Sequence, residues 1–294
     1  MATLRFVVVP KVVHPWFEEV NKGAQAQAAI LSRELRDRIV VDYRPPAVAG
    51  VAEQNAVLEE TIASRPNGIA VDPVDAPDRM TAIKSIKDRG IPVVLFDSPA
   101  LNSGITSIGN NFAEQGAIAA ERLINLIGHA GKVAIMQGYP TAPNHNQRYQ
   151  AQAAELRKYP EITIVDGGID NDDIDTARTQ ALAVLEKHAD LAGYLCCDAA
   201  GPIGIAAAIK KAGRVGTVRV VSMDGIEPIL NAIKEGVIDS SSATIPRMQG
   251  SMSVLMLWQA SLGVPLPRTI DTGIEVITRG NVDAYVARAR GQTS

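Results

Sequence analysis

Aromatic residues are scarce in this sequence: Phe, Tyr and Trp together make up 4% of its 294 residues. The hydrophobic core must therefore be built mainly from aliphatic side chains, and two neighbouring aromatics stand out. Apolar residues at 46% and charged residues at 21% are close to the averages for globular proteins. This composition argues against collagen-like, coiled-coil and disordered chains, and the length corresponds to about two domains.

An excess of one charge is also lacking, since the formal net charge is −3. A nucleic-acid-binding surface usually needs a basic patch, so we expect no nucleic-acid partner. No apolar run reaches the roughly 18 residues that a membrane-spanning helix needs. The N-terminus has no basic region followed by a long apolar run, so we expect either a processed mature chain or a cytosolic protein.

Residues that could carry metal or catalytic chemistry are few. The only cysteines, Cys196 and Cys197, are adjacent, which argues against a disulfide scaffold and a zinc finger. The four histidines do not have the spacing of metal ligands. The sequence fingerprints of nucleotide-binding loops, zinc proteases and serine hydrolases are missing. We therefore expect no metal, no cofactor and no catalytic residues.

Short β-branched runs alternate with longer amphipathic stretches along the chain. Strands separated by helices of about 10–20 residues are typical of βαβ units and a parallel sheet. We expect strands over Arg5–Val9, Ile39–Asp42, Gly68–Val71, Pro92–Phe96, Lys132–Met136, Ile162–Val165, Gly193–Cys196 and Val218–Ser222. We expect helices over Trp16–Glu34, Val51–Ser64, Pro77–Arg89, Phe112–Ile127, Asn146–Lys158, Thr176–Lys187, Gly201–Ala212, Glu227–Glu235 and Pro246–Leu262.

The strand spacing repeats in the two halves, which indicates one doubly wound unit built twice. The late extended segments Ile238–Thr244 and Ile274–Thr278 are too few for a third domain and should complete the two sheets. The prediction is an α/β fold with two doubly wound parallel-sheet (Rossmann-like) lobes, a three-strand hinge and a ligand cleft between the lobes. We expect an N-terminal lobe of residues 1–109 and 247–273, and a C-terminal lobe of residues 110–246 and 274–294.

Carboxylates dominate the carboxyl ends of the expected strands, which is where open parallel sheets bind ligands. Asp97 follows the fourth strand of the first half, and Asp224 follows the fourth strand of the second half. A carboxylate at such a position often caps the following helix by accepting backbone N–H bonds. We assign this capping role to Asp42, Asp72 and Asp166.

The segment His14-Pro15-Trp16-Phe17 follows the first strand. Pro15 suits the first turn of a helix, which places both aromatics at the helix N-terminus beside the strand end. Neighbouring helical positions point about 100° apart, so Trp16 and Phe17 cannot both be ordinary core residues. We expect a platform that stacks on a sugar ring; a hydrophobic plug between helix and sheet is the alternative.

Several segments together carry a resemblance to a known family. The chain resembles, over essentially its full length, the type I periplasmic sugar-binding proteins of ABC importers, in particular the ribose-binding-protein-like group. The order and spacing of the segments that carry this resemblance are more specific than any single motif. The segments are Val7-Val8-Val9-Pro10-Lys11, Pro15-Trp16-Phe17-Glu18, Gly23-Ala24-Gln25, Gly68-Ile69-Ala70-Val71-Asp72-Pro73, Ile91 to Asp97, Ile108-Gly109-Asn110-Asn111, Val221 to Gly225 and Ala243-Thr244-Ile245.

The resemblance implies roles for individual residues. Trp16 and Phe17 match the stacking aromatics of the family. Asp97 matches the carboxylate of the first lobe that binds sugar hydroxyls. Arg148 and Asp224 match the arginine and the carboxylate that the second lobe contributes.

Other positions depart from the ribose-binding pattern. Ser98 stands where ribose binders carry an arginine, and His14 and Cys197 each replace an asparagine, so the resemblance implies a ligand other than ribose bound in the usual mode. Arg247 falls near a glutamine of the family's hinge, with Gln249 as the alternative because the spacing differs.

A second likeness points to the branch that includes the autoinducer-2 and rhamnose binders. In that branch Lys11 would contact the ligand. Asn144-His145 stands where the autoinducer-2 receptor has an Asp-Gln pair, which counts against autoinducer-2 itself. We nevertheless include Asn144 among the expected ligand contacts.

The expected function is that of a solute receptor. It would bind a small monosaccharide or polyol by hinge closure and deliver it to the membrane subunits of an ABC permease. The resemblance also implies a periplasmic location, a monomer and a chemoreceptor as a further partner.

Two alternatives stay open. The first is the effector-binding domain of a LacI-type transcriptional regulator without its DNA-binding head, although the first strand begins too early for such a head to precede it. The second is an enzyme in which Asp97 and Asp224 act as a carboxylate pair on a glycoside.

Overall fold

The computed structural model describes residues 3–35, 37–75, 81–98 and 103–289. The chain divides into two compact units. The first unit contains Met1–Asn110, Thr141–Asn144 and Ile245–Gly273, and the second contains Asn111–Pro140, His145–Thr244 and Ile274–Ser294. The chain therefore passes between the units after residues 110, 140, 144, 244 and 273.

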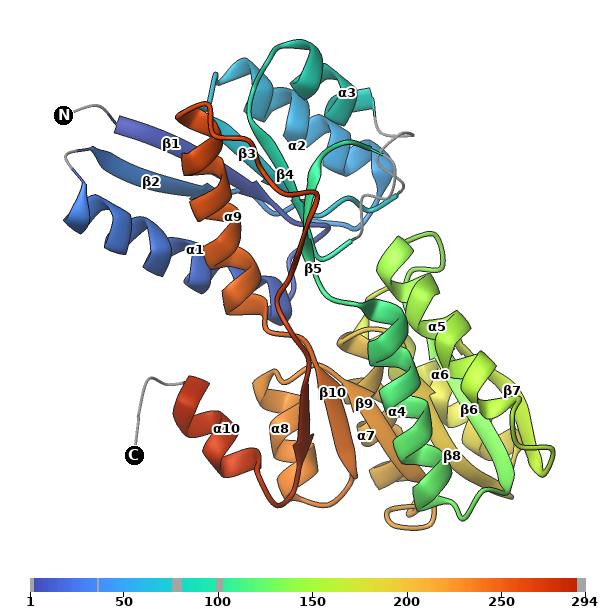
Figure 1. The fold of residues 1–294 in the computed structure, drawn as a ribbon. Helices are drawn as coiled ribbons and strands as arrows, with labels where there is room; N and C mark the ends of the chain where they lie inside the picture. Colours follow the sequence, from blue (N-terminus) through green and yellow to red (C-terminus); the bar gives the residue numbers. More distant parts are fainter. Residues whose placement is uncertain (1–2, 36, 76–80, 99–102, 290–294) are drawn as a thin grey trace. The chain divides into compact units, whose positions relative to one another are not determined.

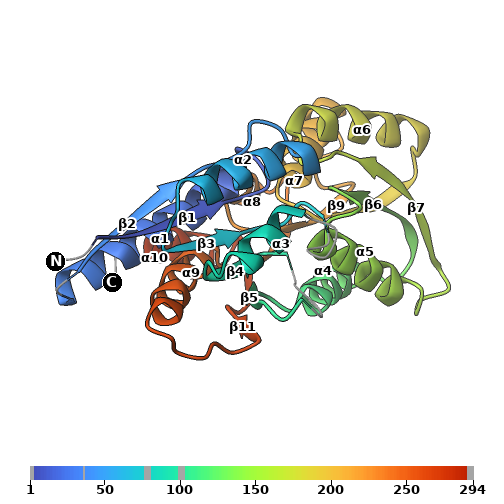
Figure 2. The same cartoon turned by 90° about the horizontal axis from the view of Figure 1, so that it is seen from above.

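The first unit is built on a parallel sheet in the order β11-β5-β4-β3-β1-β2. Its central strand β3 is buried throughout, as expected for a strand covered by helices on both faces. Figures 1 and 2 show α2 and α9 on opposite faces of this sheet. The strands are β1 (Thr3–Val9), β2 (Arg38–Tyr43), β3 (Gly68–Val71), β4 (Val93–Phe96), β5 (Thr106–Gly109) and β11 (Thr269–Asp271).

Local sequence explains the start of the first helix. His14 is its N-cap and accepts a hydrogen bond from the backbone N–H of Trp16, and Pro15 occupies the first helical position. Helices α1 and α9 pack closely, because Gly23 and Gly250 have no side chain to separate their backbones. The helices of this unit are α1 (Pro15–Glu34), α2 (Val51–Ala63), α3 (Thr81–Asp88) and α9 (Pro246–Ser261).

The second unit repeats this plan with the order β12-β10-β9-β8-β6-β7. Its strands are parallel except for the edge strand β12, which pairs antiparallel with β10. The strands are β6 (Gly131–Gln137), β7 (Ile162–Ile169), β8 (Leu191–Cys196), β9 (Arg219–Met223), β10 (Ser240–Ala243) and β12 (Glu275–Thr278).

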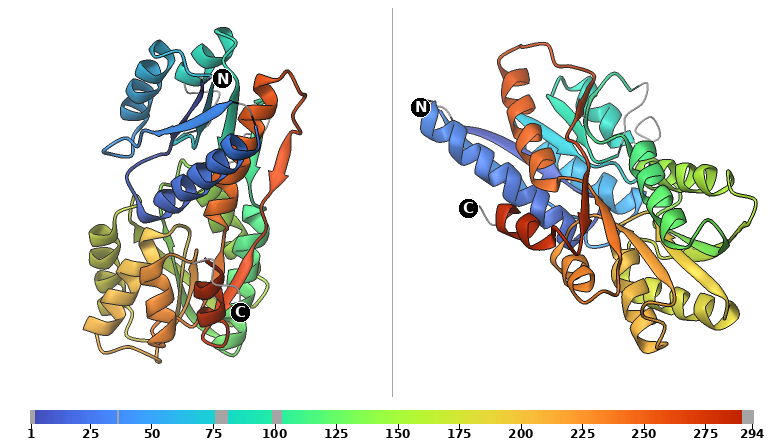
Figure 3. Two further views of the ribbon diagram at one scale, coloured as in Figure 1. Left: turned by 90° about the vertical axis from the view of Figure 1, so that its left-hand side faces the viewer. Right: turned by 60° about the horizontal axis from the view of Figure 1, so that its bottom comes forward.

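Helices cover both faces of the second sheet. Figure 3, left, shows α6 to α8, coloured yellow to orange, on one face and α4, in green, on the other. Helix α5 packs tightly on α4, because a side chain at Gly116 would lie 2.6 Å from the carbonyl oxygen of Arg148. The helices are α4 (Phe112–Leu126), α5 (Pro143–Leu156), α6 (Ile174–Lys187), α7 (Ala200–Lys211), α8 (Glu227–Lys234) and α10 (Val282–Ala289).

The predicted fold class, two doubly wound parallel-sheet units, is confirmed. Two strands escaped prediction, β5 and β11, which are only four and three residues long. The helix predicted over Pro77–Arg89 is seen as α3 from Thr81 onward, and residues 77–80 lie outside the described residues. None of the described helices combines the length and the apolar character needed to cross a membrane.

Candidate ligand-binding site

The shared sheet order makes strands of the two units equivalent. β1, β3 and β4 of the first unit correspond to β6, β8 and β9 of the second. Asp72 follows β3 where Cys197 follows β8, and Asp97 follows β4 where Asp224 follows β9. Each unit therefore carries a carboxylate at the same point of its sheet, where doubly wound folds bind ligands.

Asp97 and Asp224 share an unusual backbone conformation. Their φ angles are +55° and +65°, in the left-handed region that costs a residue with a side chain roughly 1–2 kcal/mol. Backbone hydrogen bonds hold both residues there: Asp97 N–H donates to Ile108 O at 2.9 Å, and Asp224 N–H donates to Ser242 O at 3.1 Å. Strain of this kind concentrates at functional sites, so its recurrence at equivalent positions makes the two carboxylates candidate site residues.

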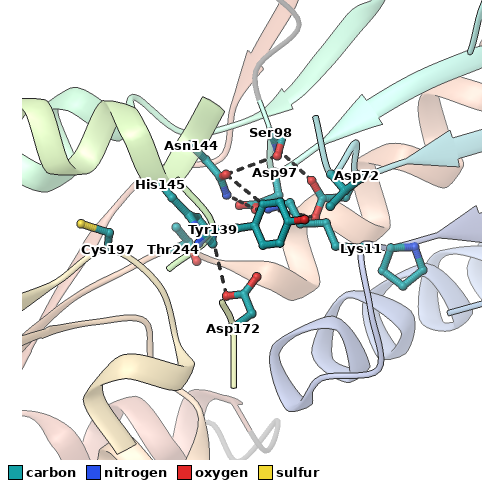
Figure 4. A network of polar contacts seen from close by, with 12 residues as sticks. Lys11, Asp72, Asp97, Ser98, Tyr139, Asn144, His145, Asp172, Cys197 and Thr244 are labelled. Atoms are coloured by element: carbon teal, nitrogen blue, oxygen red, sulfur yellow. Dashed lines mark hydrogen bonds and ion pairs between the residues drawn. The ribbon is translucent and has the colours of Figure 1, made fainter. Parts of the chain in front are cut away.

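Lys11 lies between two carboxyl groups in the first unit (Figure 4). Its Nζ is 3.5 Å from Asp72 Oδ2 and 3.4 Å from Asp97 Oδ2. The lysine is only 1% exposed, and a buried ammonium group needs such partners because burial removes its hydration. Since β1, β3 and β4 are neighbours in the sheet, their ends bring the three residues together.

Asn144 and Ser98 complete this cluster. Lys11 Nζ donates to Asn144 Oδ1 at 3.2 Å, and Ser98 Oγ donates to the same oxygen at 3.3 Å. Asn144 Nδ2 in turn donates to Asp97 Oδ2. Asn144 lies in the first turn of α5 and belongs to residues 141–144 of the first unit, so buried polar contacts hold this segment.

The helix-capping roles predicted for three aspartates are wrong. Asp42 forms ion pairs with Arg5 and Arg44. Asp166 Oδ1 accepts from the backbone N–H of Gly168, inside β7. Helix α2 instead starts at a glycine N-cap without a side-chain bond, and α6 starts at a different aspartate.

Asp72 is fully buried and accepts from the backbone N–H of Ser98 at 3.2 Å. Its Oδ1 is bonded to Ser98 and its Oδ2 accepts no hydrogen bond, so it does not cap a helix that the structure describes. Burial raises the pKa of its carboxyl to about 8; Lys11 opposes the rise and Asp97 adds to it. Asp72 is therefore a member of the polar cluster that sequence reasoning missed.

The aromatic pair lies at the start of α1, as predicted. Trp16 and Phe17 are buried, with ring centroids 5.2 Å apart in an edge-to-face arrangement. Phe17 also packs edge-on against Phe96 of β4 at 6.4 Å. Since His14 Nδ1 accepts from Trp16 N–H, a neutral His14 carries its hydrogen on Nε2. A stacking role stays a prediction, and the contact with Phe96 accounts for much of the packing of Phe17.

Arg148 lies on α5 in the second unit and is almost completely buried. Its Nε donates to Gln115 Oε1 at 2.7 Å, and its Nη1 donates to Cys197 O at 3.1 Å. The guanidinium lies 4.7 Å above the Phe112 ring, which favours a cation–π contact. These contacts fix the plane of the guanidinium group and hold it beside the end of β8.

Cys197 is buried beside Gln152, and its Sγ lies 3.6 Å from Gln152 Oε1. Burial raises the pKa of the Cys197 thiol, as it does for Cys196, so both remain protonated and weakly nucleophilic. The residue is thus a small, weakly polar group at a strand end.

Asp224 is fixed by the end of β10. Its Oδ1 accepts from the hydroxyl of Thr244 and, at 3.4 Å, from the Thr244 backbone N–H. A side chain at Gly225 would collide with Tyr285 of α10, so glycine permits this helix to pack against the loop. The carboxylate is therefore held by one oxygen.

Arg247 and Gln249, the two candidates for the hinge contact, differ in their burial and in their partners. Arg247 is exposed and pairs with Glu19 on α1 at 2.6 Å. Gln249 is fully buried, accepts from Asp97 N–H at 3.0 Å and donates to Asn110 Oδ1 at 3.0 Å. Of the two candidates, the structure places Gln249 against the site and directs Arg247 to the surface of α1.

An acidic cluster of Asp170, Asp172 and Asp198 lies beside His145 in the second unit. His145 Nδ1 accepts from Tyr139 N–H at 2.7 Å, while its Nε2 lies 3.9 Å from Asp172 Oδ1. Burial raises the pKa of Asp170 to about 7 and raises that of Asp198 well above its usual range. Among the residues that the structure describes, no group of His, Cys, Asp and Glu side chains could hold a metal ion.

The structure thus places the predicted residues in two separate sets. In the first unit Lys11, Asp97, Ser98 and Asn144 contact one another, and His14, Trp16 and Phe17 form an aromatic cluster with Phe96. In the second unit Arg148 contacts Cys197, and Asp224 contacts Thr244. Sequence reasoning missed Asp72, Gln115, Gln152 and Thr244, and kept Gln249 only as an alternative.

The sequence of residues 5–263 matches the family described as "Periplasmic binding protein domain". The D-ribose/D-allose-binding protein of Pseudomonas aeruginosa is 25% identical over 238 residues, which cover 78% of this chain and 73% of that protein. The ribose import binding protein of Bacillus subtilis is 22% identical over 272 residues, which cover 90% of this chain and 84% of that protein.

Solved structures show the same fold. A solute-binding protein of an ABC transporter from Agrobacterium vitis, bound with α-D-tagatopyranose, superposes with a TM-score of 0.89. It is 28% identical, and the alignment covers 97% of this chain and 98% of that chain. These findings confirm the resemblance to type I periplasmic sugar-binding proteins, while the rhamnose and autoinducer-2 branch stays a prediction. Because the match extends over most of the sequence, the chain belongs to the periplasmic binding protein domain family.

Proposed function

We propose that this protein captures a small neutral sugar or sugar alcohol and delivers it to the membrane permease of an ABC transporter. The observation that carries the proposal is the recurrence of a strained, buried carboxylate, Asp97 and Asp224, at the same strand end of two equivalent sheets. A basic side chain accompanies the site in each unit, Lys11 in the first and Arg148 in the second.

This residue set suits a polyol. Each sugar hydroxyl both donates and accepts, so carboxylates can accept from neighbouring hydroxyls while Arg, Lys and Asn donate in return. Charge-assisted hydrogen bonds of this kind contribute about 1.5–3 kcal/mol each. Aromatic faces such as those of Trp16 and Phe17 would cover the C–H face of the ring.

Family relatives support the ligand class. The solute-binding protein from Agrobacterium vitis holds tagatopyranose, and one from Burkholderia graminis, 27% identical with a TM-score of 0.89 and covering 96% of this chain and 97% of that one, was solved with D-arabinose. Ser98, His14 and Cys197 replace residues of the ribose-binding pattern. We therefore propose a monosaccharide or alditol other than ribose in its usual binding mode.

The two units would serve as the two lobes of the receptor. We propose that the ligand binds between them and that hinge closure brings Asp97 and Asp224 to the same molecule. Hinge closure around a ligand is the known motion of periplasmic binding proteins. We take the two compact units as the lobes: compared with the limits expected from the sequence, the first lobe then also includes residues 110, 141–144 and 245–246. Gln249 is the better hinge candidate than Arg247, because it holds the backbone of Asp97.

A periplasmic location and permease subunits as partners follow from the family. The monomeric state and a chemoreceptor partner are further parts of the proposal. The family relatives are named as binding proteins rather than enzymes, which agrees with the expected lack of catalysis. They also disfavour the LacI-type regulator.

A thermal-shift panel tests the proposal. The panel contains D-tagatose, D-arabinose, D-allose, D-fucose, L-rhamnose and xylitol, with D-glucuronate as a charged comparison. A sugar at 100 times its Kd should stabilise the protein by about 2.7 kcal/mol. Native mass spectrometry of the purified protein would reveal a ligand that co-purifies. A lack of response to every neutral sugar, together with the absence of a co-purified sugar, would contradict the proposal.

A further inference from the structure

We propose that Asp72 is a positioning residue of the ligand site: it shares the ammonium group of Lys11 with Asp97 and so sets how strongly Asp97 accepts hydrogen bonds from the ligand. This inference rests on the proposed function and deepens it. It assigns a role to a buried carboxyl group that sequence reasoning treated as a helix cap.

The geometry puts the two carboxyl groups in competition. Lys11 Nζ is 3.4 Å from Asp97 Oδ2 and 3.5 Å from Asp72 Oδ2, so the ammonium group is almost equally close to the two carboxyl groups. Both aspartates follow neighbouring strands, β3 and β4, and both are almost completely buried. In surroundings with little water, moving the ammonium toward one carboxylate leaves the other less compensated.

Among the residues that the structure describes, the charged groups that act on Asp72 include Lys11, from the loop after β1, and Asp97, from the loop after β4. Helix α2 contributes only the neutral Gln54, whose amide donates to the main-chain oxygen of Asp72 at 2.7 Å. Ser98 contributes a backbone N–H. Lys11 is thus a cation that both carboxyl groups contact, and they compete for it.

Burial makes Asp72 the group that holds the proton near neutral pH, since its pKa is raised to about 8. While Asp72 is protonated, the Lys11 ammonium group forms its ion pair with Asp97. Once Asp72 ionises, it draws the ammonium away and leaves Asp97 with more negative charge to offer a sugar hydroxyl. Ligand affinity should therefore rise as the pH passes through 8.

A purely structural role would give a different result. Asn at position 72 keeps an oxygen to accept from Ser98 N–H, and the bond from Gln54 goes to the main chain. Asp72→Asn therefore keeps the local hydrogen bonds and removes the titration together with the ion pair to Lys11. The variant should resemble the low-pH form of the wild type at every pH.

The first experiment needs no sugar. Thermal unfolding at pH 9 compares the wild type, Lys11→Met, Asp72→Asn and the double variant. Without Lys11 two buried carboxylates face each other, so Asp72→Asn should raise Tm more in the Lys11→Met background than in the wild type, by about 3 °C or more. Equal shifts in both backgrounds would overturn the inference, whatever the sugars do.

The second experiment measures binding by isothermal titration calorimetry from pH 6 to pH 9. The probe is whichever of D-tagatose, D-arabinose and D-allose gives the largest thermal shift with the wild type. Wild-type affinity should rise by up to about tenfold between pH 7 and pH 9, the equivalent of one pKa unit. Asp72→Asn should stay at the pH 7 level.

Asp42→Asn is the matched control, because Asp42 also lies at the carboxyl end of a strand of the same sheet but pairs with Arg5 and Arg44. It should follow the wild-type pH profile. A flat wild-type profile, or a rise that Asp72→Asn retains, would overturn the inference while leaving sugar binding intact. Failure of all three sugars to bind would instead contradict the proposed function. The unfolding experiment would then decide whether Lys11 and Asp72 are coupled.

Discussion

Asp224→Asn should weaken sugar binding strongly while leaving the unliganded protein almost as stable as the wild type. The substitution is close to isosteric. Asparagine tolerates the left-handed conformation that Asp224 adopts at φ +65°, and its Oδ1 can still accept from the hydroxyl and backbone N–H of Thr244. The change is therefore confined to Oδ2, the oxygen that a ligand would use.

The size of the effect follows from the hydrogen bonds involved. Replacing the free carboxylate oxygen by an amide NH2 removes one charge-assisted acceptor, which contributes about 1.5–3 kcal/mol. At about 1.4 kcal/mol per factor of ten, affinity should fall roughly 10- to 100-fold. The retained contacts with Thr244 should keep the change in the free energy of unfolding below about 1 kcal/mol.

Isothermal titration calorimetry with the best-binding panel sugar and urea unfolding of the unliganded protein measure the two quantities. Asp239→Asn is the control in the same sheet: Asp239 precedes β10, at the opposite end of the strand, and pairs with Arg219. It should leave affinity within about twofold of the wild type. The reasoning is refuted if Asp224→Asn binds as tightly as the wild type, or if it loses affinity only because it unfolds.

Three further results are expected. Since the pKa of Asp72 is about 8 when folded and about 4 when unfolded, the folded state binds more protons between pH 4 and pH 8; the Tm of Asp72→Asn relative to the wild type should rise across that window, and a constant difference would contradict this. Burial raises the pKa of the Cys196 and Cys197 thiols, so a disulfide reagent should label them only on unfolding, and rapid labelling of the native protein at pH 8 would show otherwise. In urea unfolding, Gln249→Ala should cost about 1–3 kcal/mol because it removes two buried hydrogen bonds, one from Asp97 N–H and one to Asn110 Oδ1, whereas Arg247→Ala removes an exposed ion pair and should cost less than about 1 kcal/mol; equal costs would count against the assignment.

The fold was predictable because its signals are local and repeated. Apolar strand runs such as Gly68–Val71 recur at similar spacing in both halves, and His14-Pro15 marks the start of α1. The order of strand ends then follows from the doubly wound plan. Local signals did not predict the short strands β5 and β11, because these strands depend on pairing with other strands of the sheet.

The candidate site was only partly predictable. Asp97 and Asp224 could be named because each directly follows a strand, and Lys11 was named from the resemblance to the autoinducer-2 and rhamnose binders. The role of Asp72, however, depends on a lysine 61 positions earlier in the sequence. A buried lysine at one strand end requires carboxylates at the neighbouring ends, and this argument could have identified Asp72 once the sheet order was assumed. The contacts of Gln115 and Gln249 depend on how α4 and α9 pack, which periodicity does not fix.

The most direct test of the account is a crystal structure of the protein with the panel sugar that gives the largest thermal shift. The account predicts one sugar molecule with hydroxyl groups within hydrogen-bond distance of both Asp97 and Asp224. A sugar bound elsewhere, or one held by a single unit without either carboxylate, would contradict it.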